Sequence, residues 1–239
     1  MKNKKLSISF VQRRVITSLI TCLLLVAENK VQAATFFAND WTSLQTAITN
    51  ALAHADPAST INITGGINLS SGLTIPAGAD ITLNYSGGNI YIQASGTITV
   101  ASGASLTITG IQDAIVVSGG TFINNGNLTI TSTNSGIRNG GTFTNNSTGK
   151  ITLSTPNGRI ENIGAFVNYG AIINNGIITE TTTTTGSIIN NGSITNNNVL
   201  ENSTTLTNNG TITGNITNFN NRLIPQVDGT LTNNGTIDG

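Results

Sequence analysis

Short runs in which apolar and polar residues alternate fill most of this chain, and one run recurs with nearly the same wording. In it, an apolar residue and one spacer precede Asn-Asn-Gly, and one further residue and an aliphatic residue follow. Alternation predicts short strands with one face inward, and Asn-Gly predicts a turn. A strand-turn-strand unit repeated along a chain is typical of a stacked solenoid. Close and looser copies open at Phe122, Phe143, Phe166, Ile172, Ile188, Leu206 and Leu231.

The spacing of these copies predicts the length of one coil. Openings at positions 122, 143, 166, 188, 206 and 231 are 21, 23, 22, 18 and 25 residues apart, a mean of 109/5, or about 22. Residues at equivalent positions of neighbouring coils then stack, so we expect these six apolar residues to form one buried column. An inward Asn is costly without partners, so the repeated Asn predicts a ladder of side-chain hydrogen bonds.

The region before the Asn-rich copies has different wording but the same period. Aliphatic residues alternate with Thr, Asn and Ser between turns of Gly, Ala and Ser. Strand starts are about six to nine residues apart, so three strands would again make one coil of about 22 residues. The expected strands are 61–63, 67–69, 73–75, 81–83, 90–92, 97–100, 106–108 and 115–117.

Two other structures compete with a solenoid. Asn-Gly between aliphatic residues is also a strong signal for antiparallel hairpins. The copies at 166 and 172 start only six residues apart, however, and leave hairpin arms of two or three residues. A polar low-complexity coil is the second alternative. Its weakness is that Ile, Leu, Val and Phe recur at fixed offsets, which disorder does not require.

The segment 34–58 differs from the repeats and predicts an N-terminal cap for a solenoid at 59–239. An amphipathic helix is expected from Asn39 to Ala55, with Asp40 as its N-cap and Asp56-Pro57 at its end. Such a helix would cover the open end of the first coil. Its expected apolar face consists of Trp41, Leu44, Ile48, Leu52 and Ala55.

Residues 1–33 are interpreted as a signal peptide. A basic start is followed by an apolar run from Val15 to Ala27 and by Val31-Gln32-Ala33, where a signal peptidase would cut. The run has about 13 residues against the 20 or so that a membrane span needs, although a signal anchor remains the alternative. The only cysteine, Cys22, lies within this run, so the mature chain has neither disulfides nor thiolate metal sites.

Removal of the leader changes the charge. The whole chain has 10 basic and 10 acidic residues. Six basic residues and one acid lie in the leader, which leaves 4 minus 9, a net charge of −5. Such a surface repels phosphate and disfavours binding to nucleic acid or to anionic membranes. The remaining basic residues are Arg138, Lys150, Arg159 and Arg222.

One group of acids is a candidate for chemistry. Glu161, Glu180 and Glu201 are separated by 19 and 21 residues, so coil stacking could bring them together. Arg138 and Arg159 also differ by 21 and are expected to stack beside them, as a surface ladder of weak ion pairs. The alternative for the glutamates is a line of solvated turn acids. We predict no catalytic, cofactor-binding or metal-binding residues and no enzyme activity.

The remaining chemistry-bearing residues are isolated. His54, the only histidine, is expected at the surface, and Trp41 is expected to anchor the helix. Outward-facing tyrosines at 85, 91 and 169 would be able to stack on sugars. Thr-x-Thr pairs suit outward strand positions and also resemble the threonine ranks of ice-binding solenoids. These pairs begin at 97, 107, 129, 142 and 211.

Together with the leader, these stretches resemble the right-handed parallel β-helix of bacterial autotransporter passengers and adhesins, in the pectin-lyase-like superfamily. The resemblance is one of pattern and covers essentially the whole mature chain. It implies an all-β, right-handed parallel β-helix and a place at the cell surface. The stretches are Trp41-Thr42-Ser43-Leu44-Gln45-Thr46-Ala47-Ile48, Ile75-Pro76-Ala77-Gly78-Ala79-Asp80-Ile81-Thr82-Leu83 and the Asn-Asn-Gly-Thr-Ile copies.

Two features of these relatives are not found in the sequence. Autotransporters carry a C-terminal translocating barrel, and two-partner secreted adhesins carry Asn-Pro-Asn-Gly near the mature start. Thr155-Pro156-Asn157-Gly158 is only a distant echo. The last copy stops inside a repeat at Gly239 without a cap. We therefore expect a truncated or split passenger, with a missing barrel or a partner at the C-terminal edge.

The expected function is that of an exported, non-enzymatic β-helix surface protein, either adhesin-like or structural. Its location would be extracellular or at the cell surface, in association with the outer membrane, and periplasmic without an outer-membrane translocator. Its expected partner is a host or matrix ligand, either glycan or protein, with no nucleic acid and no cofactor. The alternatives are a polysaccharide lyase or hydrolase on a β-helix and an ice-binding solenoid.

Overall fold

The computed structural model describes residues 33–54, 58–110, 113–131, 136–180, 186–218 and 229–239. The chain divides into two units, Met1–Gln32 and Ala33–Gly239. The predicted signal peptide and Cys22 lie almost wholly outside the described residues, and Asp56-Pro57, Arg222 and Asp228 also lie outside them. No helix in the described ranges has the length and apolar character that a membrane crossing requires.

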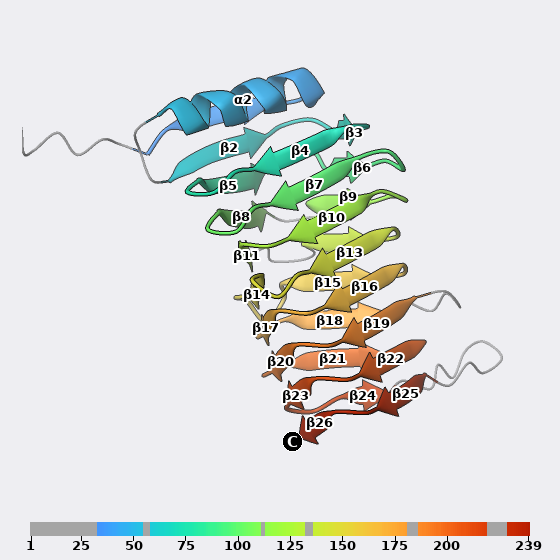
Figure 1. Ribbon diagram of the computed structural model, residues 1–239. Coiled ribbons are helices and arrows are strands. Elements are labelled where there is room, and N and C mark those ends of the chain that lie inside the picture. Colours follow the sequence, from blue (N-terminus) through green and yellow to red (C-terminus); the bar gives the residue numbers. More distant parts are fainter. Residues whose placement is uncertain (1–32, 55–57, 111–112, 132–135, 181–185, 219–228) are drawn as a thin grey trace, which may run out of the picture. The chain divides into compact units, whose positions relative to one another are not determined.

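Residues 33–239 form a parallel β-solenoid of about eight coils with about 22 residues per coil (Figure 1). Each full coil contributes one strand to each of three sheets, which confirms the predicted fold class and coil length. Neighbouring strands within every sheet pair in parallel, and antiparallel hairpins are therefore wrong.

Sheet A has ten strands and includes the first and last strands of the chain. They are β1 (Thr35–Ala38), β2 (Ser59–Ile63), β5 (Asp80–Tyr85), β8 (Ser105–Gly110), β11 (Asn127–Ile130), β14 (Lys150–Leu153), β17 (Ala171–Asn174), β20 (Ser193–Asn196), β23 (Thr211–Thr213) and β26 (Thr236–Asp238).

Sheets B and C have eight strands each. Sheet B contains β3 (Ile67–Leu69), β6 (Ile90–Ile92), β9 (Ile115–Val117), β12 (Ile137–Asn139), β15 (Arg159–Asn162), β18 (Ile177–Glu180), β21 (Val199–Asn202) and β24 (Thr217–Asn218). Sheet C contains β4 (Gly72–Ile75), β7 (Thr97–Val100), β10 (Thr121–Asn124), β13 (Thr142–Asn145), β16 (Ala165–Asn168), β19 (Ser187–Asn190), β22 (Thr205–Asn208) and β25 (Thr230–Asn233).

The predicted apolar column is present in sheet C. Phe122, Phe143 and Phe166 pair in register, and the column continues through the next three strands. The three rings are fully buried and stack with centroids 4.8 and 4.9 Å apart. Leu231, at the far end, is 36 % exposed.

The predicted Asn ladder is also present and lies beside that column. Asn124, Asn145, Asn168, Asn190 and Asn208 are fully buried, and each Nδ2 donates to the Oδ1 of the Asn in the next coil at 2.7–2.8 Å. The same Nδ2 atoms also donate to backbone carbonyls. Burial of these amides is tolerated because most of their hydrogen-bonding groups are engaged.

Each of the three sheets changes its second inward residue along the stack. In sheet C, Ile75 and Val100 precede Asn124 in the same register. In sheet B, Val117 precedes Asn139, and in sheet A, Leu153 precedes Asn174. The two halves of the sequence therefore use one architecture, with aliphatic corners in the first coils and hydrogen-bonded Asn corners in the later ones.

Helix α2 (Trp41–Ala53) packs on β1, β2 and β3 at the start of the solenoid, which agrees with a capping role. Asp40 is its N-cap, as predicted, and Trp41 is partly buried against the core. The expected apolar face is wrong at Leu52, which is 42 % exposed. The buried side chains are Leu44, Ala47, Ile48 and Ala51.

Strand β1 was not anticipated from the sequence. Its four residues pair in register with β2 and extend sheet A by one strand beyond the first full coil. The run Thr35–Ala38 is too short for alternation to distinguish it from a loop. The predicted strands from 61 to 117 all correspond to observed strands, with ends that differ by no more than two residues.

Candidate functional site

The three candidate glutamates do not form one cluster. Glu161 pairs in register with Thr179, which pairs with Glu201, so these residues form one outward column on sheet B. Glu180 lies one residue after Thr179, on the opposite side of the strand, and is 2 % exposed. The prediction that the glutamates converge is wrong, because side chains alternate across a strand and coils of unequal length change the phase.

Glu180 instead occupies a position in an inner Asn ladder. It pairs in register with Asn162, which accepts a hydrogen bond from Asn139 at 2.8 Å. Its Oε2 accepts from the backbone N–H of Thr204 at 3.0 Å. Burial raises the pKa of Glu180, although hydrogen bonds from Thr204 act in the opposite direction. Its surroundings are those of a structural residue inside the solenoid.

The two arginines do not stack on each other. Arg138 pairs in register with Glu161, and the Arg138 Nε lies 3.6 Å from the Glu161 Oε1. Arg159 pairs instead with Ile177. The expected arginine stack is wrong, but an ion pair is formed between neighbouring coils. It is partly exposed, so its contribution to stability is small.

The predicted tyrosines have three different environments. Tyr85 points inward, and burial raises its pKa, so it is excluded as an outward residue. Tyr91 lies on the outer face of β6 in sheet B and is 36 % exposed. Tyr169 directly follows β16 of sheet C and is 51 % exposed. Only the latter two are accessible to a ligand.

The Thr-x-Thr pairs fall on two different sheets. Pairs at 97 and 142 lie on sheet C, whereas pairs at 107, 129 and 211 lie on or beside sheet A. Strand register aligns their members although their sequence spacing is irregular. In sheet A, one outward column consists of Thr35, Thr60, Thr82, Thr107, Thr129 and Thr152 in consecutive strands.

Charge is distributed unevenly over the three sheets. Sheet A carries Asp80, Lys150 and Asp238, and sheet B carries Arg138, Arg159 and all three glutamates. No charged residue occurs in any of the eight strands of sheet C. Within the described ranges, no three residues among His, Cys, Asp and Glu lie close enough together to hold a metal ion.

The outer face of sheet C consists of two regular columns. The first column is Gly72, Thr97, Thr121, Thr142, Ala165, Ser187, Thr205 and Thr230. The second is Thr74, Thr99, Ile123, Thr144, Val167, Ile189, Thr207 and Thr232. We call these two columns the sheet C face. It presents hydroxyl and methyl groups at strand spacings of about 4.8 Å.

A third outer column lines the corner where sheet C turns into sheet A. Asn146 donates to Asn125 at 2.7 Å, and Asn209 donates to Asn191 at 2.8 Å. Asn234 donates to Asn209 at 2.9 Å. Tyr169 occupies the position between Asn146 and Asn191, since the backbone N–H groups of 169 and 191 bond the carbonyls of 145 and 168. The outer ladder is therefore interrupted at one exposed aromatic residue.

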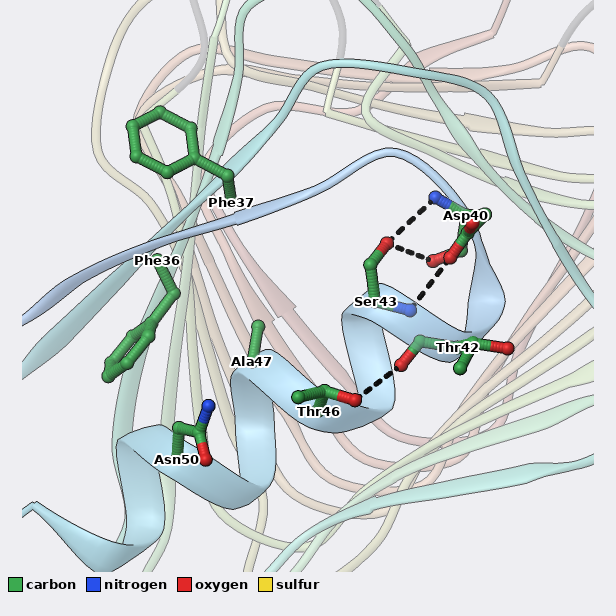
Figure 2. Close-up of a pocket in the computed structure, with 8 residues that line it drawn as sticks. All are labelled: Phe36, Phe37, Asp40, Thr42, Ser43, Thr46, Ala47 and Asn50. Atoms are coloured by element: carbon green, nitrogen blue, oxygen red, sulfur yellow. Dashed lines mark hydrogen bonds between the residues drawn. The ribbon is translucent and has the colours of Figure 1, made fainter.

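A separate open pocket of about 380 Å³ lies between β1 and α2 (Figure 2). Its polar groups serve the start of the helix: the Ser43 N–H donates to Asp40 Oδ1 at 2.7 Å, and the Asp40 N–H donates to Ser43 Oγ at 3.0 Å. These bonds lower the pKa of Asp40. His54 is exposed at the other end of the helix, as predicted, with its ring 6.3 Å from that of Phe36. No nucleophile and base pair lines this pocket.

Comparisons with known proteins do not place the chain in a family. No family model matches it, and no curated protein or solved structure matches it either.

Proposed function

We propose that this chain is an exported, non-enzymatic β-solenoid that acts as an adhesive or structural element of a cell surface and binds through a side face. The observation that carries the proposal is the sheet C face, which runs over eight strands without a charged residue. A regular, uncharged strip of hydroxyl and methyl groups suits many weak contacts with an extended partner. Export rests on the predicted leader, and kinship with autotransporter passengers and other pectin-lyase-like proteins rests on the sequence resemblance.

The arrangement of the acids supports a binding role over catalysis. Glycoside hydrolases place two carboxyl groups on either side of the scissile bond. Here, Glu180 is buried inside the stack, Glu161 is paired with Arg138, and Glu201 accepts a hydrogen bond from Thr179 at 2.7 Å. Each carboxylate is thus occupied in the fold.

The test is secretion followed by binding. The full chain is expressed in an exporting bacterium, and mass spectrometry of the secreted product is expected to place its first residue at Ala34. The product is then applied to immobilised cells, matrix proteins and polysaccharides. A Thr144→Lys, Thr207→Lys variant, which charges the sheet C face, is expected to lose binding. The matched Thr107→Lys, Thr152→Lys variant on sheet A is expected to retain it.

Three results would contradict the proposal. Equal binding by both lysine variants would remove the sheet C face from the interaction. Release of reducing ends or unsaturated sugars from any polysaccharide, abolished by Glu161→Gln, would establish an enzyme. Thermal hysteresis of the purified chain would establish ice binding.

A further inference from the structure

The interrupted outer ladder has the composition of a small binding site. The ladder amides beside the interruption have fixed orientations, because Asn146 Nδ2 donates to Asn125 and Asn191 Oδ1 accepts from Asn209. The Oδ1 of Asn146 and the Nδ2 of Asn191 therefore point toward the position of Tyr169. Among the described residues, neither atom has a hydrogen-bond partner. An acceptor and a donor thus flank one exposed ring.

The surroundings of this gap are apolar and uncharged. Tyr169 continues the outward row of Ala165 and Val167 in its own coil, and Val167 pairs in register with Ile189. All three aliphatic residues are half-buried, so they present part of their surface to solvent. The nearest charged residue along the chain before the gap is Lys150, which begins β14 on sheet A.

The spacing suits a ring-shaped ligand of sugar size. Asn146 and Asn191 belong to coils two strand spacings apart, or about 9.6 Å between their backbones. A pyranose ring fits between such amides with its C–H face on the tyrosine, since aromatic rings combine a large apolar face with a polar edge. Its hydroxyl groups both donate and accept, as the two free amide atoms require. A protein strand has no counterpart here, because every strand beside β16 in sheet C is already paired on both sides.

We propose that Tyr169, Asn146 and Asn191 form a subsite for one sugar ring of a neutral polysaccharide that lies along the sheet C face. The inference rests on the proposed function and deepens it, since it names the ligand class and the anchoring residue. Tyr169 supplies the stacking surface, and the two amides orient the ring. The threonine columns bind the neighbouring sugars through their hydroxyl groups. A neutral ligand is specified because the face and its corner carry no charge to pair with an acidic one.

The chain offers a variant that removes the subsite and should preserve the fold. Tyr169→Asn completes the outer ladder from 125 to 234, so it is expected to fold and to melt at the same or a higher temperature than the parent chain. Binding to insoluble cellulose, chitin and mannan is measured by depletion of the secreted full chain from solution. Tyr169→Asn is expected to weaken binding about tenfold to at least one of these polymers, which corresponds to about 1.4 kcal/mol. Tyr169→Phe keeps the ring and is expected to stay within about twofold of the parent.

Two further arms keep the inference separable from the proposed function. Lys150→Gln is expected to leave binding to neutral polymers unchanged, and polygalacturonate is expected to bind more weakly than they do. The inference is overturned if Tyr169→Asn binds neutral polymers as the parent does, if only polygalacturonate binds, or if only matrix proteins bind. In the last case, the adhesive function would stand. Loss of all binding to cells, matrix proteins and polysaccharides would overturn both.

Discussion

At the residue scale, Glu180 is the unusual member of an otherwise neutral ladder. Asn139 and Asn162 precede it in the same register, and both are buried amides. A carboxylate can accept hydrogen bonds as an amide does, but it can donate one only when it is protonated. A buried carboxyl group in this position therefore makes the stability of the fold depend on pH.

The sign of this dependence follows from the raised pKa of Glu180, whose ordinary value is 4.5. The folded state holds the proton more tightly than the unfolded state, so the stabilising contribution is complete below that value and is lost as pH rises through the folded-state pKa. The charged groups on the strands beside Glu180 are Arg159, Glu161 and Glu201, and all three face outward.

We expect Glu180→Gln to abolish this loss, because Gln has the same shape and donates at every pH. Its melting temperature should exceed that of the parent at pH 7, and the difference should shrink as pH falls below 4.5. Thermal melts from pH 3 to pH 8 provide the measurement. Glu201→Gln, on the outer face of the next strand, is the matched control and should retain the slope. A Gln variant with the same pH profile as the parent would show that Glu180 does not titrate in this range.

At the element scale, two ladders of opposite direction line the corner after each late strand of sheet C. The buried amides donate toward the C-terminal coil, as from Asn168 to Asn190, whereas the outer amides donate toward the N-terminal coil, as from Asn209 to Asn191. The glycine of the repeat is needed for a different reason from the one that favours hairpins. A Cβ on Gly192 would lie 2.1 Å from the backbone oxygen of Gly170, and the glycines of the Asn-Asn-Gly turns do not have positive φ.

The two ladders should contribute very differently to stability, and neighbouring residues test this. Asn190→Ala leaves the Oδ1 of Asn208 as its former partner's loss transmits only to buried groups: Asn168 Oδ1 keeps its donor, and Asn168 Nδ2 loses its acceptor on Asn190. We expect this variant to lose about 2–3 kcal/mol in the free energy of unfolding. Asn191→Ala removes only an exposed hydrogen bond to Asn209 and should cost less than about 0.5 kcal/mol. Urea unfolding of both variants gives the comparison, and equal losses would contradict it.

Much of this level was predictable from the sequence because each signal was periodic. Alternation placed the strands, and the spacing of the Asn-rich copies gave the register of Phe122, Phe143 and Phe166. The candidate site was not predictable in the same way. Coil lengths that vary from 18 to 25 residues change which side of a strand a residue faces, so Glu180 could not be assigned from its distance to Glu161. The isolated Tyr169 becomes meaningful only beside Asn146 and Asn191.

At the scale of the described molecule, stability is built from contacts between neighbouring coils. Every sheet pairs each strand only with the equivalent strands of the coils before and after it. Stability should therefore be close to a sum of coil and interface contributions, as in other repeat proteins. The uneven distribution of charge over the three sheets is independent of this stacking, because the outward residues do not determine the register of the buried columns.

This additivity predicts that one whole coil can be removed. Deletion of residues 142–164 takes out β13, β14 and β15 and places Phe166 21 residues after Phe122, the spacing that now separates Phe122 from Phe143. The buried columns stay matched, so we expect a secreted chain with one cooperative thermal transition and an unchanged circular dichroism per residue. Deletion of 142–153 removes strands from sheets C and A but none from sheet B, so all later strands lose their partners. That chain should fail to fold, and if it instead folded as well as the 23-residue deletion, the stability of the solenoid would not depend on coil register.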